Sequence, residues 1–140
     1  HVIPGLIRRF CEAVDKNEEI VNCWGTGNAI REFLHVDDFA DSCIFALEKW
    51  SPNNNDISFL NVGTGKSISI KELVTIIIKI TGFKGKVLWD ETKPDGTPIK
   101  VLDINRLKEL GWQSSIEFKE GLKKTINEFK NSYKDQDIRL

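Results

Sequence analysis

The sequence predicts an α/β fold of short strands and about five helices, and three observations support this fold class. Five stretches place apolar residues at helical spacing, as Phe118, Leu122, Ile126 and Phe129 do near the end of the chain. Short apolar runs bounded by glycine, proline or polar turns lie between them, which is typical of buried strands. One helix also begins at a clear capping box. A chain of 140 residues is long enough to bury a hydrophobic core.

The first predicted helix covers residues 2–14. Its apolar residues fall on one stripe, and Pro4 fits the first helical turn, where its missing N–H removes no hydrogen bond. Arg8 points away from this stripe and is expected to be solvated, whereas Arg9 lies at its border and can reach across a surface. Residues 20–24 then form a short strand.

Residues 24–38 are expected to contain a strand end, a glycine turn, a short strand at 32–36 and the start of a helix. Asp37 or Asp38 would cap that helix, which runs to residue 50. His35 lies between apolar neighbours, so it is expected to be structural and to satisfy a buried backbone group. A polar loop at 51–56 follows, a place for tolerated insertions and not a domain linker.

A strand is predicted at 57–62, followed by a tight turn at 63–65. The next helix has the clearest start in the chain, because Ser69 and Glu72 form an S-x-x-E capping box and the flanking Ile68 and Leu73 are placed as a hydrophobic staple. Gly82 is expected to end this helix.

The last third is predicted to contain a strand at 86–89, a proline-containing loop at 90–98 and two helices. Asp103 would cap the first of these helices, which Gly111 ends. The final helix would follow Ser114 or Ser115. Polarity rises from Asn131 onward, so the predicted organisation is a domain over residues 1–130 and a frayed tail over 131–140.

Composition excludes several classes of function. The net charge of −1 gives no electrostatic case for binding nucleic acid or an anionic membrane. No apolar run approaches the ~20 residues that span a bilayer, and no signal-peptide pattern opens the chain. Three cysteines without C-x-x-C spacing and two distant histidines suggest no metal site. Buried free thiols in a reducing cytoplasm are expected. The absence of methionine indicates a chain that begins within a longer protein.

Two glycine patterns invite a phosphate-binding interpretation, and both fail on spacing. A phosphate loop needs a glycine five residues before Gly65, where Leu60 stands. The G-x-G-x-x-G pattern that begins at Gly63 would need a third glycine at Ile68. A simple turn is therefore predicted at 63–65.

Four stretches together resemble one enzyme family. The run from Arg31 to Asp38 resembles the arginine–acid–Phe–x–His–Val–Asp–Asp signature of extended short-chain dehydrogenase/reductases that act on nucleotide sugars, the NAD-dependent epimerase/dehydratase family. Residues 61–65 also match this superfamily. Residues 1–10 and 93–98 resemble its GDP-L-fucose synthase branch. The resemblance extends from His1 to about Phe129 and identifies the chain as the C-terminal, substrate-binding portion of such an enzyme, without its N-terminal Rossmann domain.

The resemblance implies an intact enzyme that converts GDP-4-keto-6-deoxy-D-mannose to GDP-L-fucose by 3,5-epimerisation and NADPH-dependent 4-reduction. It also implies a cytoplasmic homodimer with a GDP-sugar substrate and NADPH held mainly by the N-terminal domain. His1 falls on the family histidine that lies beside the nicotinamide and is proposed as an acid/base, a role that suits a pKa near neutrality.

The remaining site residues implied by the resemblance bind the nucleotide sugar. Arg9, Arg31 and Lys100 match positions that contact the diphosphate or sugar, and guanidinium groups suit such oxygens. Trp24 matches a residue that packs near the nucleotide, although a core tryptophan is the other reading. Asp95 is carried over as a guanine or sugar contact. Each cation could also be an ordinary solvated charge. The family usually has Arg-Lys where this chain has Ile-Lys at 99–100, which leaves any contribution of position 99 in doubt.

The residues for carbonyl reduction are absent from this chain. Its only tyrosine, Tyr133, is followed by Asp137 where a Tyr-x-x-x-Lys pair would have lysine. The chain alone is therefore expected to be inactive in hydride transfer. Two alternatives stay open: another nucleotide-sugar epimerase or dehydratase, and a binding module that holds a nucleotide sugar without turning it over.

Overall fold

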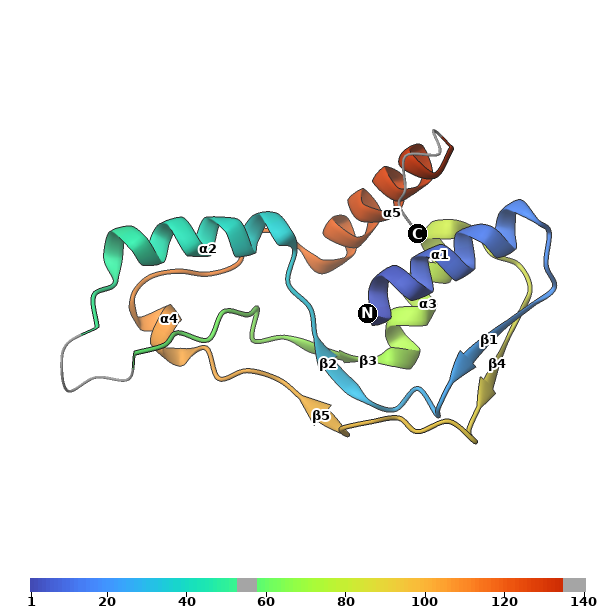
Figure 1. Ribbon diagram of the computed structural model, residues 1–140, viewed down its shortest axis with the longest axis horizontal. Helices are drawn as coiled ribbons and strands as arrows, with labels where there is room; N and C mark the ends of the chain where they lie inside the picture. Colours follow the sequence, from blue (N-terminus) through green and yellow to red (C-terminus); the bar gives the residue numbers. More distant parts are fainter. Residues whose placement is uncertain (53–57, 135–140) are drawn as a thin grey trace.

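The computed structural model describes residues 1–52 and 58–134, and this part of the chain contains five helices and five short strands (Figure 1). The helices are α1 (Val2–Asp15), α2 (Val36–Lys49), α3 (Ile70–Thr81), α4 (Asn105–Glu109) and α5 (Phe118–Lys134). The strands are β1 (Ile20–Trp24), β2 (Ile30–Glu32), β3 (Ser67–Ser69), β4 (Lys86–Asp90) and β5 (Ile99–Lys100). The predicted α/β class is confirmed.

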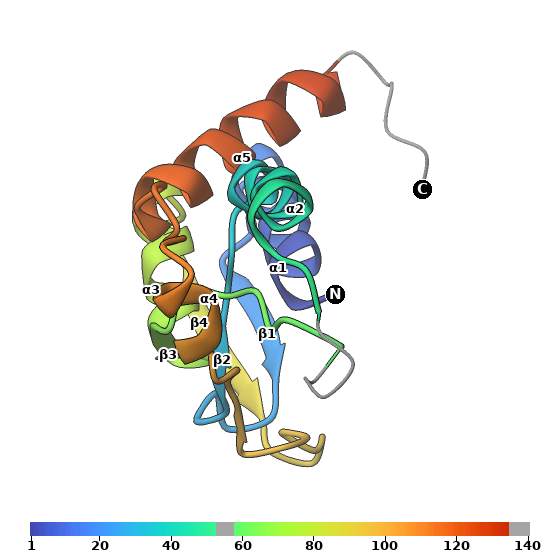
Figure 2. The same ribbon diagram turned by 90° about the vertical axis from the view of Figure 1, so that its left-hand side faces the viewer.

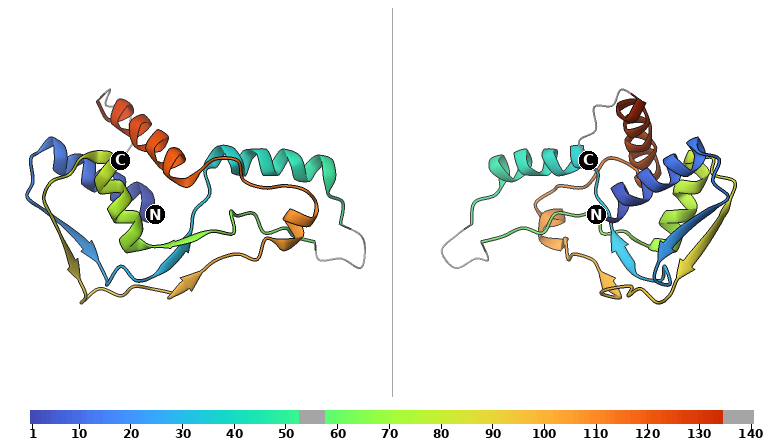
Figure 3. Two further views of the ribbon diagram at one scale, coloured as in Figure 1. Left: turned by 180° about the vertical axis from the view of Figure 1, so that it is seen from behind. Right: turned by 45° about the vertical axis from the view of Figure 1, so that its right-hand side comes forward.

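The hydrophobic core lies where α1, α3 and α5 pack on one another beside β1. The three helices are grouped at one end of an elongated molecule, and α2 extends toward the other end (Figures 1 and 3). Both ends of the chain contribute to this core, since Phe10 of α1 and Ile126 of α5 are fully buried in the same cluster. Phe10 also meets Phe83 edge to face, with ring centroids 5.3 Å apart. The predicted apolar faces of these helices are thus the faces that pack.

The strands form two small sheets. In the first, β1 and β4 pair in parallel from Ile20 opposite Lys86 to Trp24 opposite Asp90 (Figure 2). In the second, β2 is central, antiparallel to β3 and parallel to β5. The sequence predicts β1 and nearly all of β4, but it does not predict β3 or β5, which have only three and two residues.

The start of α3 confirms the local prediction. The Ser69 Oγ accepts a hydrogen bond from the Glu72 amide at 3.1 Å, and the Glu72 carboxylate accepts one from the Ser69 amide at 2.8 Å. Gly82 closes the helix in the left-handed conformation, at φ 79°. Hydrogen bonds from Ser69 hold the pKa of Glu72 below its usual range.

The predicted strand at 32–36 is wrong in its position. β2 ends at Glu32, because the partner strands β3 and β5 reach only Ile30–Glu32. Val36 already belongs to α2, so neither Asp37 nor Asp38 is its cap. His35 takes that place: its Nδ1 accepts a hydrogen bond from the Asp37 amide at 3.2 Å. His35 thus satisfies a backbone amide, as predicted, but at the start of a helix and not within a buried strand.

The predicted strand at 57–62 is also wrong for the residues that the structure describes, 58–62, because no described strand runs beside them. These residues are instead held by side chains: the Asn61 amide donates to the Asp103 carbonyl at 3.0 Å, and Arg106 donates to the Phe59 carbonyl at 3.4 Å. Residue 57 and most of the predicted loop at 51–56 lie outside the described residues.

Two further helix starts differ from the prediction by a few residues. Asp103 accepts a hydrogen bond from the Asn105 amide, yet the N-cap residue of α4 is Ile104. The last helix begins at Phe118, where the Glu117 carboxylate accepts from the Lys119 and Glu120 amides. Glu117 rather than a serine therefore satisfies the first free amides of α5.

The cysteine prediction holds for two of the three thiols. Cys11 and Cys23 are buried, and burial raises the pKa of each. Cys43 is exposed, because it lies on the outward face of α2 and not under another element. The helix α5 extends to Lys134, into the segment predicted to be frayed, and residues 135–140 lie outside the description.

Candidate functional site

Two cationic side chains meet where β2 and β5 pair. The register places Arg31 directly opposite Lys100, so the two side chains leave the same face of the sheet. The Arg31 guanidinium is half-buried and donates from Nη1 to the Ile30 carbonyl at 2.7 Å, while Lys100 is exposed. Like charges this close repel each other, and an anion placed between them would relieve that repulsion. The structure therefore brings together two of the predicted diphosphate contacts.

Asp95 lies beside this pair and binds the glycine turn after β1. Its Oδ1 accepts a hydrogen bond from the Thr26 amide at 2.7 Å, and its Oδ2 accepts one from the Thr26 hydroxyl at 2.5 Å. Gly25 has φ 75°, and a Cβ at that position would collide with the Asp95 carboxylate. Hydrogen bonds from Thr26, with one from the Gly27 amide and the charge of Arg31, lower the pKa of Asp95. Asp95 is therefore ionised at neutral pH in the folded chain.

Trp24 ends β1 and faces solvent. Its side chain is 68% exposed, which rules out the alternative reading of a core tryptophan. The Lys93 ammonium lies 6.0 Å from the ring centroid, at the outer limit of a cation–π contact. Trp24 thus presents a free aromatic surface next to the turn that Asp95 holds.

Arg9 and His1 lie apart from the Arg31–Lys100 pair. The Arg9 Nη1 donates to the Asn22 carbonyl of β1 at 2.7 Å, two residues before Trp24. This position agrees with the predicted reach of Arg9 across a surface. His1 is exposed at the N-cap of α1, and its side chain forms no capping hydrogen bond. Within the described part of the chain, no hydrogen bond or ion pair joins either residue to Arg31 or Lys100.

A cavity of about 620 Å³ lies between β2, the start of α1 and the start of α5. Of the predicted site residues, Arg31 lines this cavity, whereas His1, Arg9, Trp24, Asp95 and Lys100 do not. Its walls are mostly apolar, and Phe33 and Phe118 stack there with ring centroids 5.9 Å apart. The polar groups on its lining come from Arg31, His35, Thr64, Lys66, Ser114, Ser115, Glu117, Lys119 and Thr125.

Sequence reasoning missed Glu32, which follows Arg31. One carboxylate oxygen accepts hydrogen bonds from the Thr64 amide at 2.5 Å and the Gly65 amide at 2.6 Å, and the other accepts from the Leu102 amide at 3.0 Å. A Cβ at Gly63 would lie 2.9 Å from the Glu32 carboxyl carbon, which explains a glycine there. These partners are at least 32 residues away, so no local spacing pattern could have identified them.

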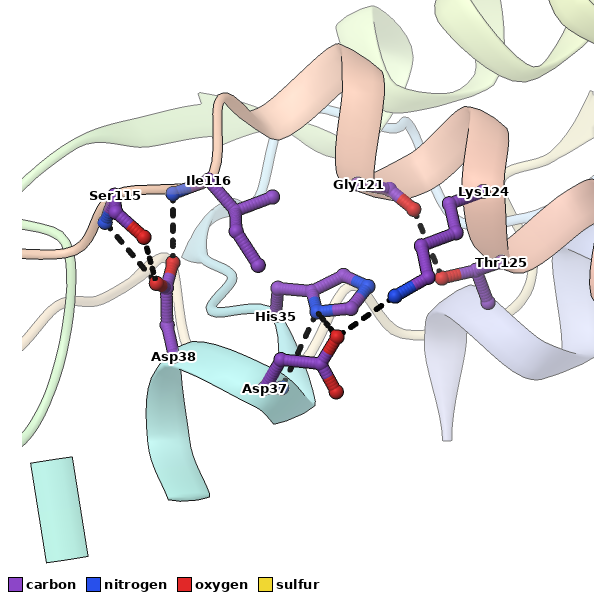
Figure 4. A network of polar contacts seen from close by, with 8 residues as sticks. All are labelled: His35, Asp37, Asp38, Ser115, Ile116, Gly121, Lys124 and Thr125. Atoms are coloured by element: carbon purple, nitrogen blue, oxygen red, sulfur yellow. Dashed lines mark hydrogen bonds and ion pairs between the residues drawn. The ribbon is translucent and has the colours of Figure 1, made fainter. Parts of the chain in front are cut away.

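Asp38 is a second missed residue, and it joins α2 to α5. Although its side chain is only 3% exposed, its carboxylate accepts three hydrogen bonds, from the Ser115 amide (3.0 Å), the Ser115 hydroxyl (2.9 Å) and the Ile116 amide (3.1 Å). Burial alone would raise the pKa of Asp38, but these hydrogen bonds and nearby His35 outweigh burial and lower it. Figure 4 shows this arrangement.

Asp37 forms the outer half of the same network. It lies 2.7 Å from the Lys124 ammonium and 3.6 Å from His35 Nδ1 (Figure 4). The hydrogen bond with Lys124 lowers the pKa of Asp37 and raises that of Lys124. Both side chains are about half exposed, so the pair contributes little to stability. Asp37 and Asp38 therefore link the start of α2 to Lys124 of α5 and to the residues that precede α5.

The described part of the chain contains neither a metal-binding cluster nor a helix that could span a membrane. No group of three or more His, Cys, Asp or Glu side chains could hold a metal ion there. Likewise, none of the helices over residues 1–52 and 58–134 has the length and apolar character needed to cross a membrane.

Comparison with known proteins gives a consistent family. The model of the "NAD dependent epimerase/dehydratase family" matches residues 1–63. A putative GDP-L-fucose synthase 2 of Arabidopsis thaliana is 48% identical over 125 residues, which cover 89% of this chain and 37% of that protein. The GDP-L-fucose synthase of Escherichia coli K12 is 47% identical over 134 residues, covering 92% of this chain and 42% of its own length. The chain thus spans about two fifths of these curated relatives.

Solved structures show the same fold. The GDP-mannoheptose C4 reductase MlghC of Campylobacter jejuni, solved with NADP bound, matches 94% of this chain and 45% of its own, with a TM-score of 0.79 and 30% identity. A GDP-L-fucose synthetase of Naegleria fowleri bound to NADP has a TM-score of 0.80 over 96% of this chain and 41% of its own, at 24% identity. From these relatives and the matched signature, the chain belongs to the NAD-dependent epimerase/dehydratase family, in which it is similar to part of the GDP-L-fucose synthases.

Proposed function

We propose that this chain is the nucleotide-sugar-binding portion, over residues 1–130, of an enzyme of the GDP-L-fucose synthase type. Such an enzyme converts GDP-4-keto-6-deoxy-D-mannose to GDP-L-fucose by 3,5-epimerisation and NADPH-dependent 4-reduction. The observation that carries the proposal is the register of β2 and β5, which sets Arg31 opposite Lys100. A cytoplasmic homodimer belongs to the same proposal.

In this proposal the ligand's diphosphate lies between Arg31 and Lys100, since two adjacent cations offset the cost of removing two phosphates from water. The exposed ring of Trp24 offers an apolar surface to the nucleotide. Arg9 extends the cationic region along β1 from α1. Asp95 keeps carboxylate lone pairs that Thr26 does not use, and these could accept from a guanine or a sugar hydroxyl.

In this proposal the described residues, 1–52 and 58–134, do not supply a dinucleotide site. Two turns have a G-x-G pattern after a predicted strand, and carboxylates already bind their amides: Asp95 binds that of Thr26, and Glu32 binds those of Thr64 and Gly65. They are therefore not available to a pyrophosphate. NADPH would be held by the part of the enzyme that this chain does not contain, and His1 is the residue here proposed to approach it. As an acid/base in epimerisation, the His1 imidazole would exchange protons with the substrate near neutral pH.

The proposal is tested by titrating the 140-residue chain with GDP, UDP and dTDP in a calorimeter. We expect the GDP complex to be the tightest, and Arg31→Ala to weaken it about ten- to hundredfold, because a charged hydrogen bond contributes roughly 1.5–3 kcal/mol. Arg31→Lys should restore only part of the affinity, since an ammonium cannot reproduce the guanidinium fork.

Arg8→Ala is the matched control. Arg8 carries the same charge on the outer face of α1, where it pairs with Glu12 at 2.7 Å. If Arg8→Ala weakens GDP binding as much as Arg31→Ala does, general electrostatic attraction explains the binding and the Arg31 contact is wrong. Equal affinity for all three nucleotides would favour another nucleotide-sugar epimerase or dehydratase. Binding with no turnover, in a complete enzyme that also contains the Tyr-x-x-x-Lys pair, would favour a binding module.

A further inference from the structure

The segment that carries Lys100 has little backbone pairing of its own. β5 contains only Ile99–Lys100, and the β2–β5 register has two residue pairs. One further backbone hydrogen bond, from the Ile30 amide to the Pro98 carbonyl at 2.7 Å, precedes the strand. So short a strand is marginal by itself. Other contacts must hold Lys100 opposite Arg31.

Two carboxylates, one on each side of this short strand, supply those contacts. Asp95 fixes the start of the segment by accepting two hydrogen bonds from Thr26. Glu32 fixes the end of the segment, because its carboxylate accepts a hydrogen bond from the Leu102 amide at 3.0 Å. This side chain therefore continues the pairing of β2 with β5 beyond Lys100. The same carboxylate binds the 63–65 turn. Lys100 is thereby held between two anchored points.

Both carboxylates bind backbone amides and a hydroxyl rather than the nearby cations. Within the described residues, neither Arg31 nor Lys100 forms an ion pair. Arg31 acts on Asp95 through its charge and lowers the pKa of that carboxyl, but the Asp95 oxygens are directed to Thr26. Two acids therefore lie beside two cations without pairing with them.

We propose that Glu32 and Asp95 are positioning residues, which hold the 95–102 segment so that Lys100 stays beside Arg31 and both cations remain available to the two phosphates of a nucleoside diphosphate. This inference rests on the proposed function. It assigns Asp95 a role through Thr26 and Lys100, in place of a direct contact with guanine or sugar. It also assigns a role to Glu32, the acid of the matched signature, whose hydrogen-bond partners lie far away in the sequence.

The direction in which Asp95→Asn changes anion binding distinguishes a positioning role of Asp95 from a purely electrostatic one. Asp95→Asn removes a negative charge beside Arg31, so a purely electrostatic role of Asp95 would make an anion bind more tightly. Positioning predicts the opposite, because the asparagine amide cannot accept both hydrogen bonds from Thr26. With inorganic pyrophosphate as the probe, we expect about three- to tenfold weaker binding by Asp95→Asn and by Glu32→Gln, the range that a lost hydrogen bond produces.

Three further variants complete the test. Thr26→Val removes the hydroxyl partner of Asp95 without changing charge and should weaken pyrophosphate binding in the same direction, whereas Thr26→Ser should restore it. Glu91→Gln removes a charge from the same loop and should leave pyrophosphate binding unchanged or slightly tighter. If Asp95 contacts the guanine or sugar directly, Asp95→Asn weakens GDP binding and leaves pyrophosphate binding unchanged, which overturns the inference.

Amide hydrogen exchange separates failure of the inference from failure of the proposed function. We expect faster exchange at Leu102 and Thr64 in Glu32→Gln, and at Thr26 in Asp95→Asn, in variants whose circular dichroism matches the wild type. Unchanged exchange at these amides overturns the positioning role even if ligands bind. If the wild type binds neither pyrophosphate nor GDP, the proposed function is wrong and the ligand part of the inference falls with it. Should Glu32→Gln not fold, the Thr26→Val and Thr26→Ser pair decides the result.

Discussion

Replacing Asp38 with asparagine tests how α2 is joined to the rest of the fold. The carboxylate is 3% exposed and accepts three hydrogen bonds from Ser115 and Ile116. An asparagine of the same size has one acceptor oxygen and turns an NH₂ group toward a backbone N–H, so at least one buried donor loses its partner. Leaving a buried donor unsatisfied costs about 1–3 kcal/mol, and the lost bonds were charge-assisted. We expect a loss of about 2–3 kcal/mol.

Thermal unfolding at pH 7 converts this free energy into a measurable shift. With an unfolding entropy of about 2.1 cal/mol/K per residue, a chain of this size should lose roughly 7–10 °C in Tm for a loss of 2–3 kcal/mol. The matched control is Asp37→Asn, in the same first turn of α2, which removes an equal charge near the helix N-terminus. Asp37 is about half exposed, and its shortest pairing, with Lys124, lies at the surface, so we expect a small shift. Equal shifts for the two variants would refute the role of the buried hydrogen bonds.

Comparing the wild type with Asp38→Asn at different pH values gives a second test. Because the folded-state pKa of Asp38 lies below its ordinary value near 4, its contribution is fully present above that ordinary value. The contribution is lost as the pH falls from about 4 through the lower folded-state pKa. The Tm difference between wild type and Asp38→Asn should therefore be constant from pH 7 to about 5 and narrow below pH 4. A difference that stays constant down to pH 2 would contradict the carboxylate as its source.

Two further predictions follow from other parts of the fold. Ser69→Ala removes the N-cap of α3 and should cost about 1 kcal/mol, a Tm decrease of roughly 3 °C, with unchanged preference among GDP, UDP and dTDP; an unchanged Tm would show that the cap is not needed. The outward stripe of α2 exposes Val36, Phe39, Ile44 and Leu47, so the chain should bind a hydrophobic dye and self-associate in sedimentation experiments. Leu47→Lys should reduce both signals and the neighbouring Glu48→Gln should not; a monomer without dye binding would contradict this.

The elements that the sequence predicts well are those whose causes are local. The start of α3 depends on Ser69 and Glu72, three residues apart, and its end depends on the backbone freedom of Gly82. The apolar stripes of α1 and α5 lie within single helices. For the same reason, the exposure of Arg8 and the structural role of His35 could be predicted from their immediate neighbours.

The elements that were missed or misplaced depend on distant partners. β2 ends at Glu32 because β3 pairs with it only that far and β5 only as far as Arg31. Residues 58–62 have the composition of a strand but no described neighbour to pair with. The hydrogen bonds that Asp95 accepts from Thr26 and Asp38 accepts from Ser115 likewise join residues 69 and 77 positions apart. Motif resemblance pointed to Arg31, Trp24, Asp95 and Lys100, but only the structure shows which of them are neighbours.

The pairing of β1 with β4 has a consequence for how this chain folds. Ile20 has no strand partner until Lys86 has been made, and the core around Phe10 also needs Ile126 of α5. Contacts between residues so far apart in sequence close large loops, which slows folding. During synthesis, α1 and β1 would leave the ribosome well before their partners, with apolar faces uncovered. We expect this chain to reach its native packing only after release of its C-terminal helix, and to depend on chaperones until then.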